Sequence, residues 1–245
     1  MTKEEIRQTV RTRLTLAGVA CFPGVEARIP NFGGAERAAQ LLCELPMWKR
    51  AKVIKINVDA PQLPLRRAAL RDNKIVYLSM PRLRSERCFV ELDPEKLGAN
   101  IVRVASLNGA RQFGRLMAPH EMRPVDLIVC GSVAVTRQGA RLGRGGGYCD
   151  LEYALLRTAG KIREYTPILT TVHPLQIVDD RLPMRGHDIP VDFVVTPLQV
   201  IAAPSLHPRP RGVIWEILRE DKIAVIPLLR KGRREVLGAP TPRRL

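Results

Sequence analysis

One glycine-rich segment, residues 141–150 (RLGRGGGYCD), constrains the fold of this chain more than any other stretch of its sequence. The apolar run before it, residues 125–135 (VDLIVCGSVAV), follows a proline and is rich in valine, which predicts a buried strand. The segment after it, residues 151–158 (LEYALLRT), combines good helix formers with apolar residues spaced for one helix face. The sequence therefore predicts a strand, a glycine-rich turn and a helix in succession.

Four glycines lie in this turn: Gly143, Gly145, Gly146 and Gly147. Glycine adopts left-handed backbone conformations and lets a ligand come close to the main chain. Because backbone amides at the start of a helix carry partial positive charge, such a turn attracts phosphate. Arg141 and Arg144 add forked donors for phosphate oxygens, and Tyr148 suits stacking or hydroxyl bonding beside them. The turn is therefore a candidate nucleotide-phosphate site.

Asp150 closes the segment and is placed to hold a hydrated Mg²⁺ ion on that phosphate. A glycine run also occurs in turns that are merely flexible, and the sequence leaves this alternative open. The spacing matches neither G-x-G-x-x-G nor G-x-x-x-x-G-K-[ST], so neither the dinucleotide-binding fingerprint nor the P-loop applies.

The turn resembles the glycine-rich signature of the 5-formyltetrahydrofolate cyclo-ligase (methenyltetrahydrofolate synthetase) family, and within it most closely the methenyltetrahydrofolate synthetase domain-containing proteins. The similarity runs over roughly residues 3–217. Its further segments are residues 28–32 (RIPNF), 81–84 (PRLR), 125–135, 147–154 (GYCDLEYA), 171–173 (TVH), 187–189 (HDI) and 191–196 (VDFVVT). These motifs are more specific for the superfamily than for one reaction.

The resemblance implies an ATP- and Mg²⁺-dependent ligase that converts 5-formyltetrahydrofolate to 5,10-methenyltetrahydrofolate. ATP phosphorylates the formyl oxygen, the N10 amine attacks, and phosphate departs. Positioning and charge stabilisation are then the work of the protein, with Arg144 on the transferred phosphate. Lys3 and Arg7, four residues apart on an opening helix, match the pair that reaches the ATP phosphates in this family. Asp59 falls where a carboxylate contacts the folate.

Each of these assignments has an ordinary structural alternative. Basic residues four apart usually lie on a solvated helix face, and a loop aspartate such as Asp59 often caps a helix. Cys149 stands where the cyclo-ligases carry a second tyrosine, and residues 108–119 (NGARQFGRLMAP) lack the family's tryptophan, with Phe113 the sole aromatic. The folate half of the site therefore looks altered. His173 suits either ligand binding or the capping of a loop.

The chain has 245 residues and a net charge of +16, which suits anionic partners such as nucleotides, RNA or other polyanions, and also a merely soluble basic surface. Two alternative functions follow: a nucleotide- or RNA-binding regulatory protein that keeps the fold, and an ATP-dependent enzyme for another small anionic substrate. No apolar run of 18 residues occurs, and the five cysteines are scattered. We therefore expect a cytoplasmic protein without membrane spans.

The order of predicted elements indicates an α/β fold, a mostly parallel open sheet with helices on both faces, of the cyclo-ligase type. Helices are expected at residues 3–17, 35–45 and 65–71, and strands at 53–58, 74–79, 88–92, 101–105 and 168–172. Residues 191–196 and 199–203 are expected to form an edge hairpin. We predict a domain at residues 1–206 and a basic Arg/Pro-rich extension at 207–245 that is dispensable for nucleotide binding, with short helices at 215–230.

Overall fold

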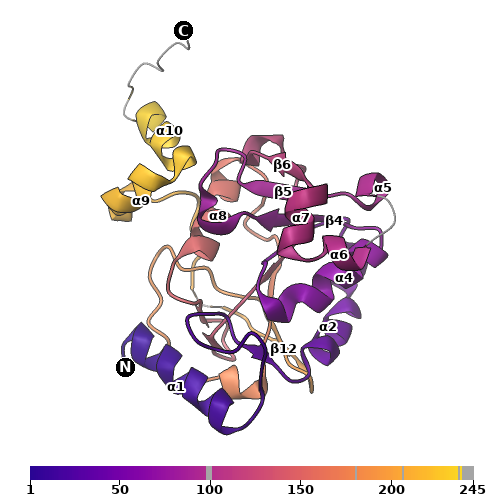
Figure 1. Cartoon of the computed structure of the whole chain (residues 1–245). Coiled ribbons are helices and arrows are strands. Elements are labelled where there is room, and N and C mark those ends of the chain that lie inside the picture. The colour runs from indigo at the N-terminus through magenta and orange to yellow at the C-terminus, as the bar shows by residue number, and fades with distance from the viewer. Residues whose placement is uncertain (98–100, 180, 206, 237, 239–245) are drawn as a thin grey trace.

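An eight-stranded sheet forms the centre of the protein in the computed structural model, which describes residues 1–97, 101–179, 181–205, 207–236 and 238 (Figure 1). The strand order is β12-β11-β10-β7-β3-β4-β5-β6. The strands are β3 (Val53–Ile56), β4 (Ile75–Ser79), β5 (Phe89–Leu92), β6 (Arg115–Met117), β7 (Leu127–Cys130), β10 (Ile168–Thr171), β11 (Phe193–Val195) and β12 (Val200–Ala202).

The inner strands of this sheet are parallel and its edges are antiparallel. β3 lies between β4 and β7, with Ile54 opposite Val76 on one side and Leu127 on the other, and β10 and β11 continue the parallel set. β12 turns back along β11, and β5 and β6 run antiparallel at the opposite edge. The predicted parallel sheet and its edge hairpin are confirmed.

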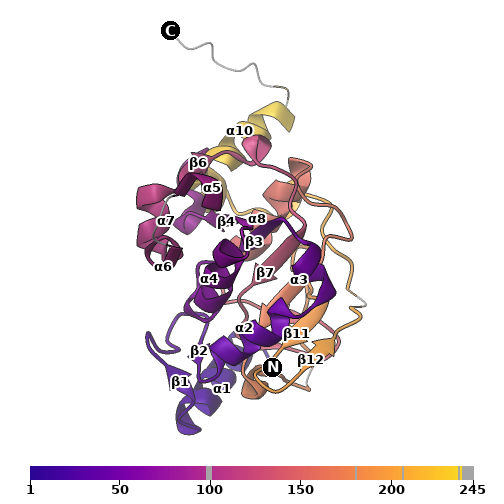
Figure 2. The ribbon, with the colours of Figure 1, turned by 90° about the vertical axis from the view of Figure 1, so that its right-hand side faces the viewer.

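Helices cover both faces because alternate residues of each buried strand face opposite sides. Ile54 and Val76 belong to the core beneath α2 (Ala35–Cys43), α4 (Leu63–Arg71), α6 (Ile101–Val104) and α7 (Leu107–Phe113). Val53 and Ile75 belong to the core on the other face, beneath α8 (Tyr148–Thr158). Figure 2 shows α2 and α4 in front of the strands.

The opening helix, α1 (Lys3–Leu16), packs on a smaller satellite core through Ile6, Val10 and Leu14. Thr2 caps it as expected, within a capping box completed by Glu5. The remaining elements are the paired strands β1 (Ala20–Cys21) and β2 (Asn31–Phe32), the paired strands β8 (Ala134–Val135) and β9 (Arg141–Leu142), and the helices α3 (Pro46–Arg50) and α5 (Pro94–Leu97).

Two predicted elements differ from the structure. Residues 101–105, expected as a strand, contain helix α6, since a short segment rich in apolar residues fits either element. Residues 125–135, expected as one strand, form β7 and β8 with Gly131, Ser132 and Val133 between them. β8 leaves the main sheet and pairs with β9, so β9 rather than the main-sheet strand leads into the glycine turn.

The C-terminal part returns to the body of the protein. A short 3-10 helix, η5 (Trp215–Ile217), precedes α9 (Glu220–Val225) and α10 (Pro227–Val236). This agrees with the short helices predicted at residues 215–230. Ile223, Ile226 and Leu229 are buried in the same core as α8. The predicted boundary at residue 207 stays a prediction. Within the described residues, no helix is long and apolar enough to cross a membrane.

Candidate active site

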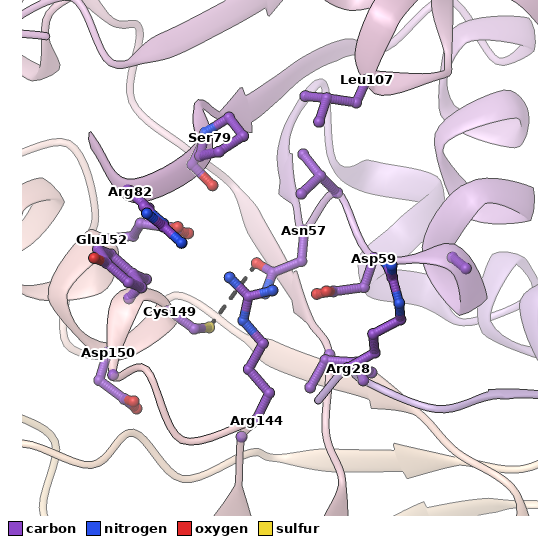
Figure 3. Close-up of a pocket in the computed structure, with 18 of the residues that line it drawn as sticks. Arg28, Asn57, Asp59, Ser79, Arg82, Leu107, Arg144, Cys149, Asp150 and Glu152 are labelled. Carbon is purple, nitrogen blue, oxygen red and sulfur yellow. Dashed lines mark hydrogen bonds between the residues drawn. The ribbon is translucent and has the colours of Figure 1, made fainter. Parts of the chain in front are cut away.

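The direction in which the chain adds strands to the sheet reverses between β3 and β7, and a cavity of about 370 Å³ opens there (Figure 3). β3 is followed along the chain by β4 on one side, whereas β7 is followed by β10 on the other side. Open α/β sheets bind ligands at such a point, outside the carboxyl ends of the strands. The cavity is lined by residues 57–60 after β3, 79–82 after β4, Gly131 after β7 and the glycine turn before α8.

The glycine turn has the backbone geometry that its sequence predicts. Gly145 has a φ of 111° and Gly147 a φ of 64°, which side-chain-bearing residues rarely adopt. Gly147 is the N-cap of α8, so the first free amides of this helix belong to the turn. The turn therefore presents amides at a helix start beside the cavity, as phosphate binding needs.

Arg141 and Asp150 form a buried ion pair behind the turn. Nη2 of Arg141 lies 2.6 Å from Oδ1 of Asp150, and the arginine also donates to the carbonyl oxygens of Gly131 at 2.9 Å and Ile189 at 3.3 Å. Burial alone would raise the pKa of Asp150, but Arg141 and the Ile189 amide together outweigh burial, so this pKa is lowered. The guanidinium of Arg141 is thus committed to the protein, and its direct contact with phosphate stays a prediction that this geometry does not favour.

Three arginines at the cavity have free guanidinium groups. Arg144, Arg28 and Arg82 line it, are exposed, and make no hydrogen bond or ion pair with other described residues. Figure 3 shows Arg144 rising from the turn into the cavity. Arg28 and Arg82 were not predicted as site residues, although both lie in the resemblance segments RIPNF and PRLR. Three arginines without a hydrogen-bonded or ion-paired partner among the described residues suit this cavity to an anionic ligand.

Asp59 lies in the same cavity, after β3, as its sequence position predicts. Burial raises the pKa of its carboxyl group, and the charge of Arg144 partly opposes this. A Cβ atom on Gly131 would lie 2.8 Å from Oδ2 of Asp59, so the glycine leaves the room that this carboxylate occupies. No side-chain cap hydrogen bond ties Asp59 to the helical turn that follows it, although capping was its structural alternative.

A buried polar network forms the floor of the cavity. Nζ of Lys55, on β3, lies 2.5 Å from Oε2 of Glu152, on α8, and also donates to Asn57 Oδ1. Burial by itself lowers the pKa of Lys55, but Glu152 outweighs it and the pKa is raised. This network was missed in the sequence, where a lysine within the apolar run VIKINV was its signal. Its charges are balanced, and Glu152 lines the cavity.

Cys149 lies beside this network, with its Sγ 3.9 Å from Asn57 Oδ1. The neighbouring Cys130 thiol, together with the cations Arg141 and Lys55, outweighs burial and lowers the pKa of Cys149 to about 7. The same contact raises the pKa of Cys130. This pairing was missed in the sequence analysis, because Cys130 and Cys149 belong to different elements.

A second cavity, of about 550 Å³, lies against the other side of the turn and is lined by Lys3 and Arg7. Lys3 Nζ lies 2.5 Å from Asp188 Oδ2, so it is paired in this structure. Arg7 is buried, and its Nε donates to the carbonyl oxygen of Gly143 at 2.8 Å. Both residues line this cavity together with Gly143, Gly145 and Gly147 of the turn, and their contact with ATP phosphates stays a prediction.

Of the remaining candidate residues, some line the first cavity and others lie away from it. Tyr148 lines the first cavity and is its one aromatic lining residue among those described. Phe113 is not part of that lining, whereas Leu107, at the other end of the same helix α7, is. His173 caps a short 3-10 helix, where its Nδ1 accepts from the Leu175 amide at 3.2 Å. The structure therefore favours the capping alternative for His173.

Comparison with known proteins agrees with this architecture. The sequence model of the 5-formyltetrahydrofolate cyclo-ligase family matches residues 2–197. Methenyltetrahydrofolate synthase domain-containing proteins of Bos taurus and Danio rerio are 36% and 37% identical over 238 residues, covering 96% and 95% of this chain. These matches span 63% and 62% of the two relatives, so the chain corresponds to less than two thirds of their length.

A solved structure shows the same fold. The NMR structure of Aquifex aeolicus 5,10-methenyltetrahydrofolate synthetase aligns with a TM-score of 0.52 and 22% identity, covering 90% of this chain and 98% of that one. The predicted resemblance is confirmed by the family match over most of the chain and by the relatives. The chain belongs to the 5-formyltetrahydrofolate cyclo-ligase family.

Proposed function

We propose that this chain is an ATP-dependent ligase that converts 5-formyltetrahydrofolate to 5,10-methenyltetrahydrofolate. The observation that carries the proposal is the position of Arg144. Its guanidinium is free of protein partners among the described residues, and it rises from a left-handed glycine turn at the sheet's switch point into a cavity that also holds Asp59. A cation there is suited to stabilising charge on a phosphoryl group in transfer.

The two cavities support a reaction between two substrates. Arg141, Gly143, Gly147 and Asp150 line both of them, so the glycine turn is their common wall. We assign the nucleoside and inner phosphates of ATP to the cavity of Lys3 and Arg7, and the folate together with the γ-phosphate to the cavity of Arg144 and Asp59. Phosphate would then pass from one substrate to the other along the turn. Holding the two reactants in this geometry is itself a large part of catalysis.

Magnesium fits this donor set as a companion of phosphate. The described residues contain no group of three histidine, cysteine or acidic side chains that would hold a metal by themselves. Mg²⁺ commonly binds through one or two carboxylates together with substrate phosphates and water. Asp150 Oδ1 accepts from Arg141 and from the Ile189 amide, which leaves Oδ2 as the oxygen for the ion. When bound, Mg²⁺ would neutralise phosphate charge.

The residues of this chain then have separate tasks. The amides of Gly145, Gly146 and Gly147 bind phosphate oxygens, and Arg144 stabilises the charge of the transferred group. Asp59 has a raised pKa and faces the cavity, which suits hydrogen bonding to the polar edge of the pterin. These roles involve binding and charge, with no covalent enzyme intermediate. We place this activity in the cytoplasm, as the scattered reduced cysteines suggest.

A second candidate is an ATP-dependent reaction on another small anionic substrate. The specific observation in its favour is the scarcity of aromatic surface in the first cavity. Cys149 and Leu107 line it where a pterin ring would gain from stacking, and Tyr148 alone supplies a ring among the described lining residues. The three free arginines suit any compact anion. We therefore expect turnover of 5-formyltetrahydrofolate to be weak.

The test measures binding and turnover separately. Calorimetry with Mg-ATP should give a saturable heat, and incubation with ATP and 5-formyltetrahydrofolate should give the absorbance of the methenyl product. No binding of Mg-ATP by the folded chain would overturn the proposal as a whole. Binding of Mg-ATP without methenyl product would overturn the folate reaction and support the second candidate.

A further inference from the structure

Helix α9 lies directly against the glycine turn and brings a lysine to it. Nζ of Lys222 donates to the carbonyl oxygen of Gly146 at 2.7 Å and lies 5.0 Å from the ring centroid of Tyr148. Figure 1 shows α9 and α10, in yellow, beside α8. Lys222 thus contacts the residues on either side of Gly147, although 76 residues separate it from Gly146.

The position of Lys222 is fixed by packing. Ile223 and Ile226, which follow it, are buried in the core that also contains Leu151 and Leu155 of α8. Lys222 itself is half-buried, and its ammonium lies close enough to the turn that a Cβ atom on Gly147 would come within 3.1 Å of Nζ. The buried neighbours of Lys222 therefore hold its ammonium group beside the turn.

The turn is held at both ends by cations from opposite ends of the chain. Arg7, on α1, donates its Nε to the carbonyl oxygen of Gly143 at 2.8 Å, and Lys222 does the same for Gly146. Within a trans peptide group the C=O and N–H bonds point in opposite directions. Fixing these two carbonyls therefore fixes the directions of the amides of Arg144 and Gly147, which start the phosphate-binding surface.

We propose that Lys222 is a positioning residue for the phosphate-binding turn, so that the segment after residue 197, beyond the family match, completes the site. This inference rests on the proposed function, namely that the turn binds the phosphates of ATP. Lys222 lines neither of the two cavities. It acts through the Gly146 carbonyl and the Tyr148 ring rather than by touching substrate. The expectation that residues after 207 are dispensable for nucleotide binding is not supported by these contacts.

The experiment compares three single variants of the full chain. Lys222→Met keeps the length of the side chain and removes its donor and charge, Lys222→Arg keeps both, and Lys52→Ala removes an exposed charge just before β3 as the control. Calorimetry gives the Kd for Mg-ATP, thermal unfolding gives the Tm, and steady-state kinetics give KM for each substrate. We expect Lys222→Met to weaken Mg-ATP binding about tenfold, in line with removal of a charged hydrogen bond.

Lys222→Arg should restore most of the affinity, and Lys52→Ala should match the wild type. The KM for ATP should rise in Lys222→Met while the KM for the second substrate stays close to its wild-type value. A Lys222→Met protein with a lower Tm but unchanged Mg-ATP affinity would show a purely structural lysine and overturn this inference. Absence of Mg-ATP binding in the wild type would instead overturn the proposed function.

Discussion

The carboxylate of Asp150 lies 2.6 Å from Nη2 of Arg141, and only 1% of the arginine side chain is exposed. The pair joins the N-terminal turn of α8 to β9 on the other side of the glycine turn. A buried charge that loses its partner cannot regain its hydration shell, so such pairs are costly to break. Asp150 therefore holds the turn together, in addition to any role in binding Mg²⁺.

We predict that Asp150→Asn destabilises the protein as well as impairing turnover. Removing the negative charge leaves Arg141 buried without a counter-charge, which costs roughly 3 kcal/mol and lowers the Tm by roughly 6–12 °C in a chain of this size. Thermal unfolding measures the change. Glu44→Gln is the matched control, because it breaks the exposed Lys49 pair and should leave the Tm nearly unchanged. An unaltered Tm in Asp150→Asn would contradict the buried-pair argument.

The same pair predicts a pH dependence of stability. The pKa of Asp150 is lower in the folded chain than its ordinary value near 4. The carboxylate therefore contributes stability that is present above about pH 4 and is lost as the pH falls through the lower, folded-state pKa. The free energy of unfolding should therefore depend less on pH in Asp150→Asn than in the wild type. Chemical denaturation of both proteins between pH 3 and 6 would measure it.

For Arg144 we expect a large effect on Mg-ATP binding and a small effect on stability. Arg144→Ala should leave the Tm almost unchanged, because the side chain is exposed and has no protein partner among the described residues. Binding of Mg-ATP should weaken about 10- to 100-fold, the range for removal of a hydrogen bond between charged groups. Calorimetry gives the affinity, and Arg137→Ala, another exposed arginine outside the cavity, is the control. Equal affinities in the two variants would remove Arg144 from the site.

Most of the fold was predictable because its signals are local. The run VIKINV predicts β3 by its β-branched residues, and the stripe of Ile6, Val10 and Leu14 predicts α1. The run at 101–105 misled because five residues fit a strand as well as a helical turn, and the choice depends on packing against α4 and α7. The departure of β8 from the main sheet also depends on contacts beyond the strand itself, since Val135 pairs with Arg141 across the loop of residues 136–140.

The site was predictable only in part, because its residues meet through the sheet topology. The glycine turn and Asp59 carry their own signals, one by composition and one by position after a strand. Arg28, in a loop, and Arg82, in a short 3-10 helix, are far apart in the chain, and apart from the resemblance segments that contain them nothing distinguishes them from surface arginines. Arg141 presents the converse problem. An arginine in a glycine turn suggests a phosphate ligand, and only the structure shows that Asp150 and two carbonyls occupy its guanidinium.

Cys149 should react with electrophiles near neutral pH. Its pKa is lowered to about 7, so the rate of iodoacetamide labelling should rise with a midpoint near pH 7 and level off above it. Mass spectrometry of the labelled peptides separates it from the other cysteines. Cys88, buried and with a pKa raised to about 12, is the internal control and should stay unlabelled. Cys130→Ala should move the midpoint upward, and a wild-type midpoint near pH 9 would contradict the thiol contact.

The basic face of α10 is predicted to bind polyanions. Arg230, Lys231 and Arg234 are exposed on this helix. Replacing all three by alanine should flatten the dependence of RNA affinity on salt, by about 0.7 log units per log salt for every RNA phosphate that these side chains bind in the wild type. Fluorescence anisotropy with a short single-stranded RNA at several salt concentrations measures the slope.

A control triple variant, Arg50→Ala with Lys52→Ala and Arg71→Ala, removes the same charge from another part of the surface. If α10 binds RNA through its own contacts, the control keeps the wild-type slope. Equal slopes in the two triple variants would mean that net charge alone, and no defined surface, governs the affinity.

The substrate question centres on Cys149. A tyrosine there would project a ring into a cavity of about 370 Å³ whose described lining has Tyr148 as its one aromatic residue. If that cavity holds the pterin, Cys149→Tyr should lower the KM for 5-formyltetrahydrofolate several-fold, since stacking adds about 0.5–1.5 kcal/mol beyond area burial. The growth of methenyl absorbance with ATP present measures the rate. Cys149→Leu fills space without a π face and is the matched control. An unchanged or higher KM in Cys149→Tyr, with Mg-ATP affinity intact, would place the pterin elsewhere and favour a different anionic substrate in this cavity.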